Sequence, residues 1–367
     1  MITIDSKQLA TALQFVGSVV SSRVTLPILG SIRLKADGDV LTLTSTDLEV
    51  FLEDTVVLLE DGEIDICVPY KRFFDLIKQM KDTVRISVDN DSLIIKSSVG
   101  SYKIQGYSSV DFPNEFDAGG ISPLSFLIDG SLLKNWLPHV LFAVGTDDLR
   151  PAMTGLYMRH DGDNTLSLVC TDGHRLSEVK LLYNFDSSFG VIIPKLAATM
   201  ISRQDGEEVQ VVILGDQFAS FLYDGKRRIY TRLITEPYPK YEAVIPNKSD
   251  CSVGYAVDRD NFRESVERLI SFANQNTKQI RAEFSSNRLT LIGEDIDLSA
   301  EGRESLVVSG NGELVIGFNG SYMAEVLKHL VEEEAWVYMS TANRPILFDN
   351  DIQRLLVMPV MLNKYEL

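Results

Sequence analysis

Histidine is the residue most often used for acid–base chemistry at neutral pH, and the chain has four: His139, His160, His174 and His329. Asp172 and His174 are the best candidates, because they stand two residues apart in the segment TDGHRL. However, no nucleophile can be assigned to them, and the four histidines lack the paired spacing of metal ligands. The sequence also lacks a Gly-x-Ser-x-Gly elbow and a Gly-x-x-x-x-Gly-Lys phosphate loop. We therefore predict no catalytic residue, no metal site and no cofactor.

Three cysteines, Cys67, Cys170 and Cys251, are too few and too far apart for a disulfide framework or a zinc site. Each lies near an apolar run, so we expect buried free thiols. The N-terminal segment does not resemble a secretory signal, and no apolar stretch approaches the roughly 18 residues of a membrane helix. The sequence thus predicts a soluble, cytoplasmic protein without a membrane partner.

The elements that would position these residues occur three times in the chain. A first type of helix is predicted at 6–20, 129–145 and 258–274, where apolar residues recur at helical spacing after a capping Asp or Ser. A second type is predicted to start at Pro69, Pro194 and Asn319, at intervals of 125 residues. Alternating strands separate the helices, and hairpins follow the second helix of each copy. The period is too long for a solenoid, so it indicates duplicated domains.

Each copy is a strand-rich α+β domain with two helices. The turn-rich segments 118–126 and 247–252 place the domains at 1–120, 121–248 and 249–367, the last including a C-terminal tail. Three similar domains in one chain favour a curved or ring-like assembly built by pseudo-symmetry. The segment Gly310-Asn311-Gly312 lacks the rest of a dinucleotide fingerprint and is interpreted as a hairpin turn.

Charge is distributed unevenly along the sequence. The whole chain has a net charge of −17, whereas the six helical segments together carry +5, which leaves −22 for the rest. If the helices shared one surface, that surface would attract a phosphate backbone without reading its sequence. The candidate cations are Lys71, Arg72, Lys78, Lys195 and Arg203. The alternative is that they are ordinary solvated positions on amphipathic helices.

The middle copy departs from the other two after a repeated aspartate. Leu48-Glu49-Val50 and Ile296-Asp297-Leu298 continue as ordinary strands in the outer copies, but the middle copy has Gly173-His174-Arg175. Glycine permits an unusual backbone angle or the close approach of another chain. A departure confined to one repeat indicates that a function was added there.

Three segments resemble the bacterial DNA polymerase III beta subunit family of sliding clamps: RVTLPIL at 23–29, CTDGHRL at 170–176 and VMPV at 357–360. The resemblance extends over the whole chain. It implies the DNA clamp fold and a head-to-tail homodimer that forms a ring around DNA, with the helices lining the central hole. It also implies a processivity factor without catalytic activity. The implied partners are double-stranded DNA of any sequence, the polymerase catalytic subunit, the clamp loader and other proteins that carry a clamp-binding motif.

The resemblance further implies a hydrophobic cleft between the second and third domains, which receives partner peptides rich in Gln, Leu and Phe. Met, Val and Leu side chains make an adaptable apolar pocket, and polar groups at its rim fix the orientation of a ligand. For any single residue of this cleft, Val244 or Leu356 for example, ordinary core packing is the alternative. On this chain the cleft comprises Met153, Thr171, Gly173, His174, Arg175, Leu176, Pro239, Val244, Asn319, Tyr322, Leu356, Met358, Pro359, Val360 and Leu362.

Two other surfaces follow from the same resemblance. Arg23 matches a position that faces DNA, and the dimer contact joins Tyr102 and Ile104 of the first domain to Leu269 and Ile270 of the third. For Leu269 and Ile270, burial within their own domain is the alternative. Acidic residues of the third domain, between Glu294 and Glu304, would face Lys71, Arg72 and Lys103 across this contact. The chain departs from the family at Met361, where an arginine is usual, in the added residues 363–367, and at Ala152, where many relatives have an aromatic residue. A peptide-binding scaffold that never encloses DNA is the rival interpretation.

Overall fold

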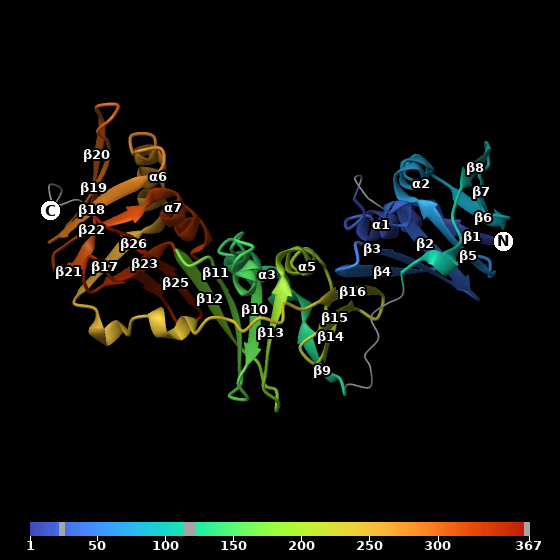
Figure 1. Ribbon diagram of the computed structural model, residues 1–367, viewed down its shortest axis with the longest axis horizontal. Helices are drawn as coiled ribbons and strands as arrows, with labels where there is room; N and C mark the ends of the chain where they lie inside the picture. Colours follow the sequence, from blue (N-terminus) through green and yellow to red (C-terminus); the bar gives the residue numbers. More distant parts are fainter. Residues whose placement is uncertain (22–25, 114–121, 363–367) are drawn as a thin grey trace. The chain divides into compact units, whose positions relative to one another are not determined.

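The computed structural model describes residues 1–21, 26–113 and 122–362, which divide into two compact units (Figure 1). Unit 1 comprises residues 1–132 and 203–233, and unit 2 comprises residues 133–202 and 234–367. The boundary between the units therefore falls inside the middle repeat. Each unit is described by itself below.

The predicted threefold repeat is confirmed, because the elements follow one another in the same order three times. The order is a strand, a first helix, four strands, a second helix and three strands. The first repeat contains β1 (Ile2–Asp5), α1 (Ser6–Val16), β2 (Ser31–Asp37), β3 (Val40–Thr46), β4 (Val50–Val57), β5 (Ile64–Pro69), α2 (Tyr70–Ile77), β6 (Thr83–Asp89), β7 (Ser92–Lys96) and β8 (Ser101–Gln105).

The second and third repeats keep this order with small changes. The second contains β9 (Leu124–Asp129), α3 (Gly130–Trp136), α4 (Pro138–Leu141), β10 (Gly155–His160), β11 (Thr165–Thr171), β12 (Arg175–Leu182), β13 (Phe189–Pro194), α5 (Lys195–Ile201), β14 (Glu208–Leu214), β15 (Phe218–Tyr223) and β16 (Arg227–Arg232). The third contains β17 (Val253–Asp258), α6 (Arg259–Ile270), β18 (Gln279–Ser285), β19 (Arg288–Asp295), β20 (Ala300–Val307), β21 (Ser309–Asn311), β22 (Leu314–Asn319), α7 (Gly320–His329), β23 (Glu334–Met339), β24 (Ile346–Asp349), β25 (Gln353–Val357) and β26 (Pro359–Val360). Short 3-10 helices are η1 (Pro27–Gly30), η2 (Ser109–Asp111), η3 (Pro151–Thr154), η4 (Tyr241–Val244) and η5 (Lys248–Asp250).

Side-chain caps fix where several helices begin. Asp5 accepts hydrogen bonds from the first-turn amides of α1, Asp258 does the same for α6, and Asn319 caps α7 as the sequence predicted. The predicted helix at 129–145 is wrong in one respect, since it is broken into α3 and α4 at Pro138. Proline has no N–H to donate to the preceding turn, so the helix is interrupted there.

Unit 1 contains two antiparallel sheets. One has the strand order β1-β6-β7-β8, and the other has the order β5-β2-β3-β4-β16-β15-β14-β9. The second sheet is continuous across the first and second repeats because β4 pairs with β16. Helix α1 packs on β3 and β4 and buries Leu9, Leu13 and Val16 completely.

Unit 2 also contains two antiparallel sheets, with the orders β13-β10-β11-β12-β25-β24-β23-β17-β21 and β20-β19-β18-β22-β26. Pairing of β12 with β25 makes the first of these continuous across the second and third repeats. Helices α6 and α7 lie side by side and bury an apolar face that includes Phe262, Leu269 and Leu327 (Figure 1). These cores confirm the α+β class that the sequence predicted.

Gly310-Asn311-Gly312 is not the hairpin turn that the sequence suggested. Ser309–Asn311 form the short edge strand β21, which pairs with β17. A Cβ on Gly310 would lie 2.1 Å from the carbonyl oxygen of Gly254, so only glycine allows the two strands to approach this closely.

The thiols behave largely as expected. Cys67 and Cys170 are buried, and burial raises the pKa of the Cys67 thiol to about 12. Cys251 is only half-buried, so the expectation of a buried thiol fails there. Within the described part of the chain, no helix is long and apolar enough to span a membrane, and no group of three or more potential metal ligands is present.

Candidate functional site

In all three repeats the repeated aspartate caps the turn that follows it. In the middle repeat, Asp172 Oδ1 accepts the amides of His174 and Arg175 at 2.8 and 2.9 Å. Asp47 in the first repeat and Asp295 in the third accept the equivalent pairs of amides. A carboxylate that satisfies two successive amides fixes the backbone of a tight turn.

The backbone of this turn corrects one expectation from the sequence. Gly173 has a φ of 86°, but Leu48, at the equivalent place in the first repeat, has a φ of 81°. The outer copies are therefore not ordinary strands here, since residues 296–299 of the third repeat also form a turn. Leu48 shares the left-handed conformation of Gly173, so this conformation does not require glycine, whereas Ile296 of the third repeat does not adopt it. What glycine adds is space, because a Cβ on Gly173 would lie 3.0 Å from Arg150 Nη1.

The side chains that follow Gly173 are held by aromatic residues of other elements. The exposed His174 ring stacks on Tyr322 of α7, with the ring centres 5.4 Å apart. The Arg175 guanidinium lies over Tyr322 at 5.0 Å and over Phe142 at 5.4 Å. It also pairs with Asp172 at 3.2 Å and with Glu325 of α7. The turn is thus bound to the second helix of the third repeat.

A cavity of about 330 Å³ opens at this turn. Four of the predicted cleft residues line it: Met153, His174, Arg175 and Tyr322. Sequence reasoning missed Val144, Gly145, Thr146, Asp147, Arg150 and Asp172, which complete its lining. Asp147 and Arg150 form an ion pair within this loop, with an Nε to Oδ2 distance of 2.9 Å, but no motif in the sequence marks the loop.

A small apolar cluster lies beside the same turn. Leu176 of β12 and Leu356 of β25 are directly paired across the strands, and both are almost fully buried. They pack with Val169, Leu347 and Tyr241, and the partly exposed Tyr238 and Ile245 cover them. The main chain of the third repeat is tied to the turn as well, because the Met358 amide donates to the His174 carbonyl at 2.8 Å.

This arrangement of three similar repeats has a counterpart in known proteins. Models of the DNA polymerase III beta subunit match the chain in three consecutive parts: the N-terminal domain at 1–115, the central domain at 127–240 and the C-terminal domain at 242–361. The chain belongs to this family. It is a DNA sliding clamp in function, a processivity factor of replication.

Relatives from Pseudomonas aeruginosa support this membership. The beta sliding clamp of that organism is 32% identical over 372 residues, covering 98% of this chain and 99% of that protein. The crystal structure of its DNA polymerase III subunit beta has a TM-score of 0.92 and 31% identity, covering 98% of this clamp and 100% of that chain. A crystal structure of the same organism's clamp bound to griselimycin has a TM-score of 0.91 and 31% identity, covering 98% and 99%.

The remaining predicted cleft residues of this clamp differ in exposure. Val244 is 48% exposed, whereas Thr171, Leu176 and Leu356 are buried. Asn319 is occupied by the fold, since its Oδ1 caps α7 and its Nδ2 donates to the Thr277 carbonyl at 2.9 Å. The partly exposed members are Pro239, Met358, Pro359, Val360 and Leu362, of which Pro359 and Val360 pair with β22. The tail at 363–367 lies outside the described residues.

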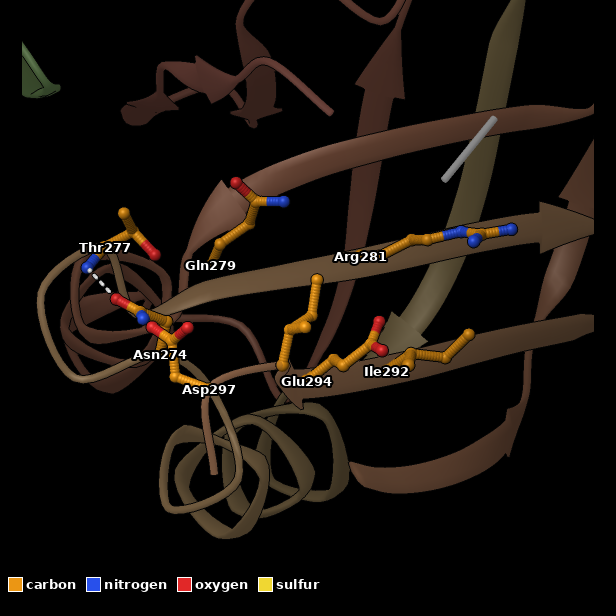
Figure 2. A pocket seen from close by; sticks show the side chains of 8 residues that line it. Asn274, Thr277, Gln279, Arg281, Ile292, Glu294 and Asp297 are labelled. Atoms are coloured by element: carbon orange, nitrogen blue, oxygen red, sulfur yellow. Dashed lines mark hydrogen bonds between the residues drawn. The ribbon is translucent and has the colours of Figure 1, made fainter. Parts of the chain in front are cut away.

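A second hollow of this clamp lies elsewhere in unit 2 (Figure 2). It has a volume of about 370 Å³ and sits on β18, β19 and the loop after α6, where Asn274 Oδ1 accepts the Thr277 amide. Its lining includes Arg281, which pairs with Glu283 at 2.5 Å, and Glu294. None of the predicted cleft residues contributes to it, so it is separate from the cavity at His174.

The predicted DNA-facing cations lie on or directly after the second helices. Lys71 and Arg72 are exposed on α2, and Lys78 is exposed directly after it. Lys195 is exposed at the start of α5 and Arg203 just after its end. Lys78 Nζ pairs with Asp75 Oδ1 at 3.1 Å, so the carboxylate partly offsets the positive charge at this position. Arg23 lies outside the described residues.

The predicted dimer residues divide into two groups. Ile104 and Leu269 are 3% and 2% exposed within their own units, so their side chains have little area left for a partner. Tyr102 is 38% exposed and Ile270 is half-buried. In the predicted acidic run, Asp295 is buried as the turn cap and Glu304 pairs with Arg268 at 2.8 Å, whereas Glu294, Asp297 and Glu301 are exposed.

Proposed function

We propose that this clamp closes head to tail with a second copy into a ring around duplex DNA and holds partner proteins through the cavity at His174. The observation that carries the proposal is this cavity, which is present beside the one turn where the middle repeat departs from its sisters. The proposed domains are 1–120, 121–248 and 249–367. The proposed location is the cytoplasm, where replication takes place in bacteria.

The cleft for partner peptides would combine a polar rim with an apolar floor. His174, Arg175 and Tyr322 form the rim, and their stacked, flat surfaces suit the side chains of an inserted peptide. The buried pair Leu176 and Leu356 supports the floor, and the exposed Val244 and partly exposed Met358 offer apolar surface beside it. Proposed occupants are the polymerase catalytic subunit, the clamp loader and other proteins with a clamp-binding motif.

The ring would close through edge strands. Strand β8, which carries Tyr102, is the edge of its sheet, and so is β20 of the third repeat. An edge strand presents unpaired backbone groups to another chain. Lys103 near this edge and the exposed Glu294 and Glu301 near β20 supply opposite charges, which set register more than affinity. The exposed cations of α2 and α5 would contact the DNA backbone.

We further propose that the clamp is not an enzyme. Asp172 and His174 have the residue types of an acid–base pair, but their groups serve other purposes. Asp172 accepts two backbone amides and the Arg175 guanidinium, and the His174 ring stacks on Tyr322. The side chains of this site are thus arranged to contact a binding partner rather than to transfer protons.

Topology is the property that tests the ring. The clamp would be loaded by its loader onto nicked circular plasmid, and half of the sample would then be cut with a restriction enzyme. We expect the clamp to stay on circles and to be lost from linear DNA. Equal retention on both forms would mean direct adhesion, and failure of an active loader to place it on either would favour the peptide-binding scaffold.

The cleft is tested separately by His174→Ala. Loss of the stacked ring should weaken binding of a fluorescent peptide rich in Gln, Leu and Phe by about tenfold or more, as expected for a binding hot spot. The dimer, measured by sedimentation, should persist. The matched control is Leu182→Ala at the other end of β12, where the side chain is 92% exposed. Unchanged peptide affinity in His174→Ala would refute the assignment of the cleft.

A further inference from the structure

We propose that Glu178, a buried carboxylate outside the cleft, is a positioning residue that holds the linker between the second and third repeats in the shape needed for peptide binding. The linker, residues 234–252, carries Pro239 and Val244 of the proposed cleft. This inference rests on the proposed function of that cleft. It adds a residue that no peptide would touch.

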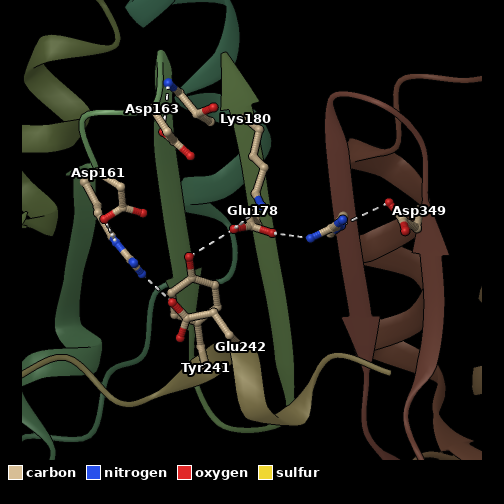
Figure 3. Close-up of polar contacts among 10 residues, drawn as sticks. Asp161, Asp163, Glu178, Lys180, Tyr241, Glu242 and Asp349 are labelled. Carbon is tan, nitrogen blue, oxygen red and sulfur yellow. Dashed lines mark hydrogen bonds and ion pairs between the residues drawn. The ribbon is translucent and has the colours of Figure 1, made fainter. Parts of the chain in front are cut away.

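Glu178 lies on β12 and is 1% exposed (Figure 3). Its Oε1 accepts a hydrogen bond from the Tyr241 hydroxyl at 2.9 Å and lies 3.7 Å from Lys180 Nζ. Its Oε2 accepts from Arg354 Nη1 at 3.5 Å, and Arg354 in turn donates to Asp349 at 3.2 Å. A buried carboxylate is costly without partners, and these three donors offset that cost.

These contacts join three parts of the chain at one carboxylate. Glu178 belongs to the middle repeat, Arg354 stands opposite it on β25 of the third repeat, and Tyr241 begins η4 of the linker. Burial, together with the nearby carboxylate, raises the pKa of the Tyr241 hydroxyl. The phenol therefore keeps its proton at neutral pH and remains a donor to Glu178.

The position of Tyr241 determines the position of the neighbouring cleft residues. Its ring packs with Leu176 and Leu356, which lie beside the His174 turn. Its amide donates to the Pro239 carbonyl at 2.7 Å, and Val244 ends the same single turn of helix. Tyr241 and Val244 belong to one turn of 3-10 helix and Pro239 is hydrogen-bonded to Tyr241, so a shift of Tyr241 moves both Pro239 and Val244.

The linker also has anchors that do not involve Glu178. Arg159 pairs with Glu242, Lys248 pairs with Asp349 at 3.4 Å, and Tyr238 stacks on Tyr157 at 4.4 Å. Replacing the Glu178 carboxylate with a neutral group weakens its hydrogen bond with Tyr241, so the linker should stay attached while the segment around Tyr241 loosens. Expressed as free energies, the expected loss of peptide binding is larger than any loss of folding stability.

The test uses the full-length clamp with Glu178→Gln and, as a milder change, Tyr241→Phe. Each should weaken binding of the fluorescent Gln-, Leu- and Phe-rich peptide by about three- to tenfold, the range expected for one buried hydrogen bond. The double variant should bind no more weakly than the weaker-binding single variant, because both changes act on the same contact.

The chain provides a matched control in unit 1. Asp54 is also completely buried and pairs with an arginine, Arg227, at 2.9 Å. Asp54→Asn should lower the urea midpoint of the clamp without changing peptide affinity. If Asp54→Asn weakens the peptide as much as Glu178→Gln does, the effect is one of stability and the proposal is overturned.

Comparison with His174→Ala separates this inference from the function it depends on. If wild type binds the peptide, His174→Ala weakens it, and both Glu178→Gln and Tyr241→Phe bind like wild type, Glu178 is not a positioning residue. If His174→Ala has no effect, the cleft itself is misassigned and the inference falls with it. Should Glu178→Gln fail to fold, Tyr241→Phe alone decides between these outcomes.

Discussion

Leu269 and Ile270 are neighbours at the end of α6, but the structure predicts different consequences for truncating them. Leu269 is 2% exposed in the core of unit 2. A Cβ on Gly293 would lie 2.5 Å from the Leu269 carbonyl, and one on Gly302 would lie 2.9 Å from Leu269 Cδ2. The end of α6 therefore already touches the sheet and cannot move closer to fill a cavity.

Because the site cannot collapse, Leu269→Ala should cost about 4 kcal/mol, in the upper part of the range of 2.7–5.0 kcal/mol known for buried leucines. Ile270→Ala should cost about half as much or less, since its side chain is only half-buried. Leu298→Ala, at a position 68% exposed, should stay within about 0.5 kcal/mol of wild type.

Urea unfolding followed by tryptophan emission suits this measurement. The chain has two tryptophans, Trp136 and Trp336, and both lie in unit 2, so the signal reports the unit that contains Leu269. Protein concentration must be held constant, because the proposed association with a second copy would add to apparent stability. A Leu269→Ala variant with the wild-type urea midpoint that sediments as a monomer would contradict this reasoning. It would show that Leu269 acts between copies rather than in the core.

Two further predictions concern the His329 region and the His174 turn. Burial lowers the pKa of His329 below that of the unfolded chain, about 6.5, with His139 and Lys328 acting in the same direction. The unfolded state then binds more protons, so the stability contributed by His329 is fully present above about pH 6.5 and declines as the pH falls. The drop in Tm of the clamp from pH 7.5 to 5.5 should therefore be smaller in His329→Asn. A drop equal to that of wild type would argue against this assignment. Gly173→Ala should lower the free energy of unfolding by about 1–2 kcal/mol, because the φ of this residue is 86° and a Cβ would press on Arg150. Leu48→Ala should cost clearly less, because that position has a φ of 81° and already carries a side chain. Equal losses in urea midpoint would refute the role assigned to Gly173.

The sequence was sufficient for features that depend on local patterns. The 125-residue interval of the second helices and the Asn319 cap were predictable because caps and helical periodicity are local. The break at Pro138 was also visible in the residue type, although the surrounding apolar pattern favoured one continuous helix. Element ends were less predictable, since α1 stops at Val16 although the apolar spacing continues to Val20.

Features that depend on tertiary contacts were not predictable in this way. The alternation of residue types on β8 predicts that Tyr102 and Ile104 belong to one strand, but the burial of Ile104 depends on how the sheet packs in the folded protein. The Leu48 backbone is set by hydrogen bonds to the side chains of Asp47 and Thr46, which override the usual preference of leucine. Likewise, the Glu178–Tyr241 contact joins residues 63 positions apart, and no local sequence pattern around either residue predicts it.

The aspartate turn shared by the three repeats has a consequence for how such a chain can diversify. The carboxylates of Asp47, Asp172 and Asp295 accept the amides of the second and third residues after them, so the side chains at those two positions need not hold the turn. They can change from Glu-Val to His-Arg without a new loop structure having to evolve. A duplicated domain with this turn contains a position where mutations alter surface chemistry at little risk to folding. One copy could acquire a recognition site while the other two continued to serve as framework.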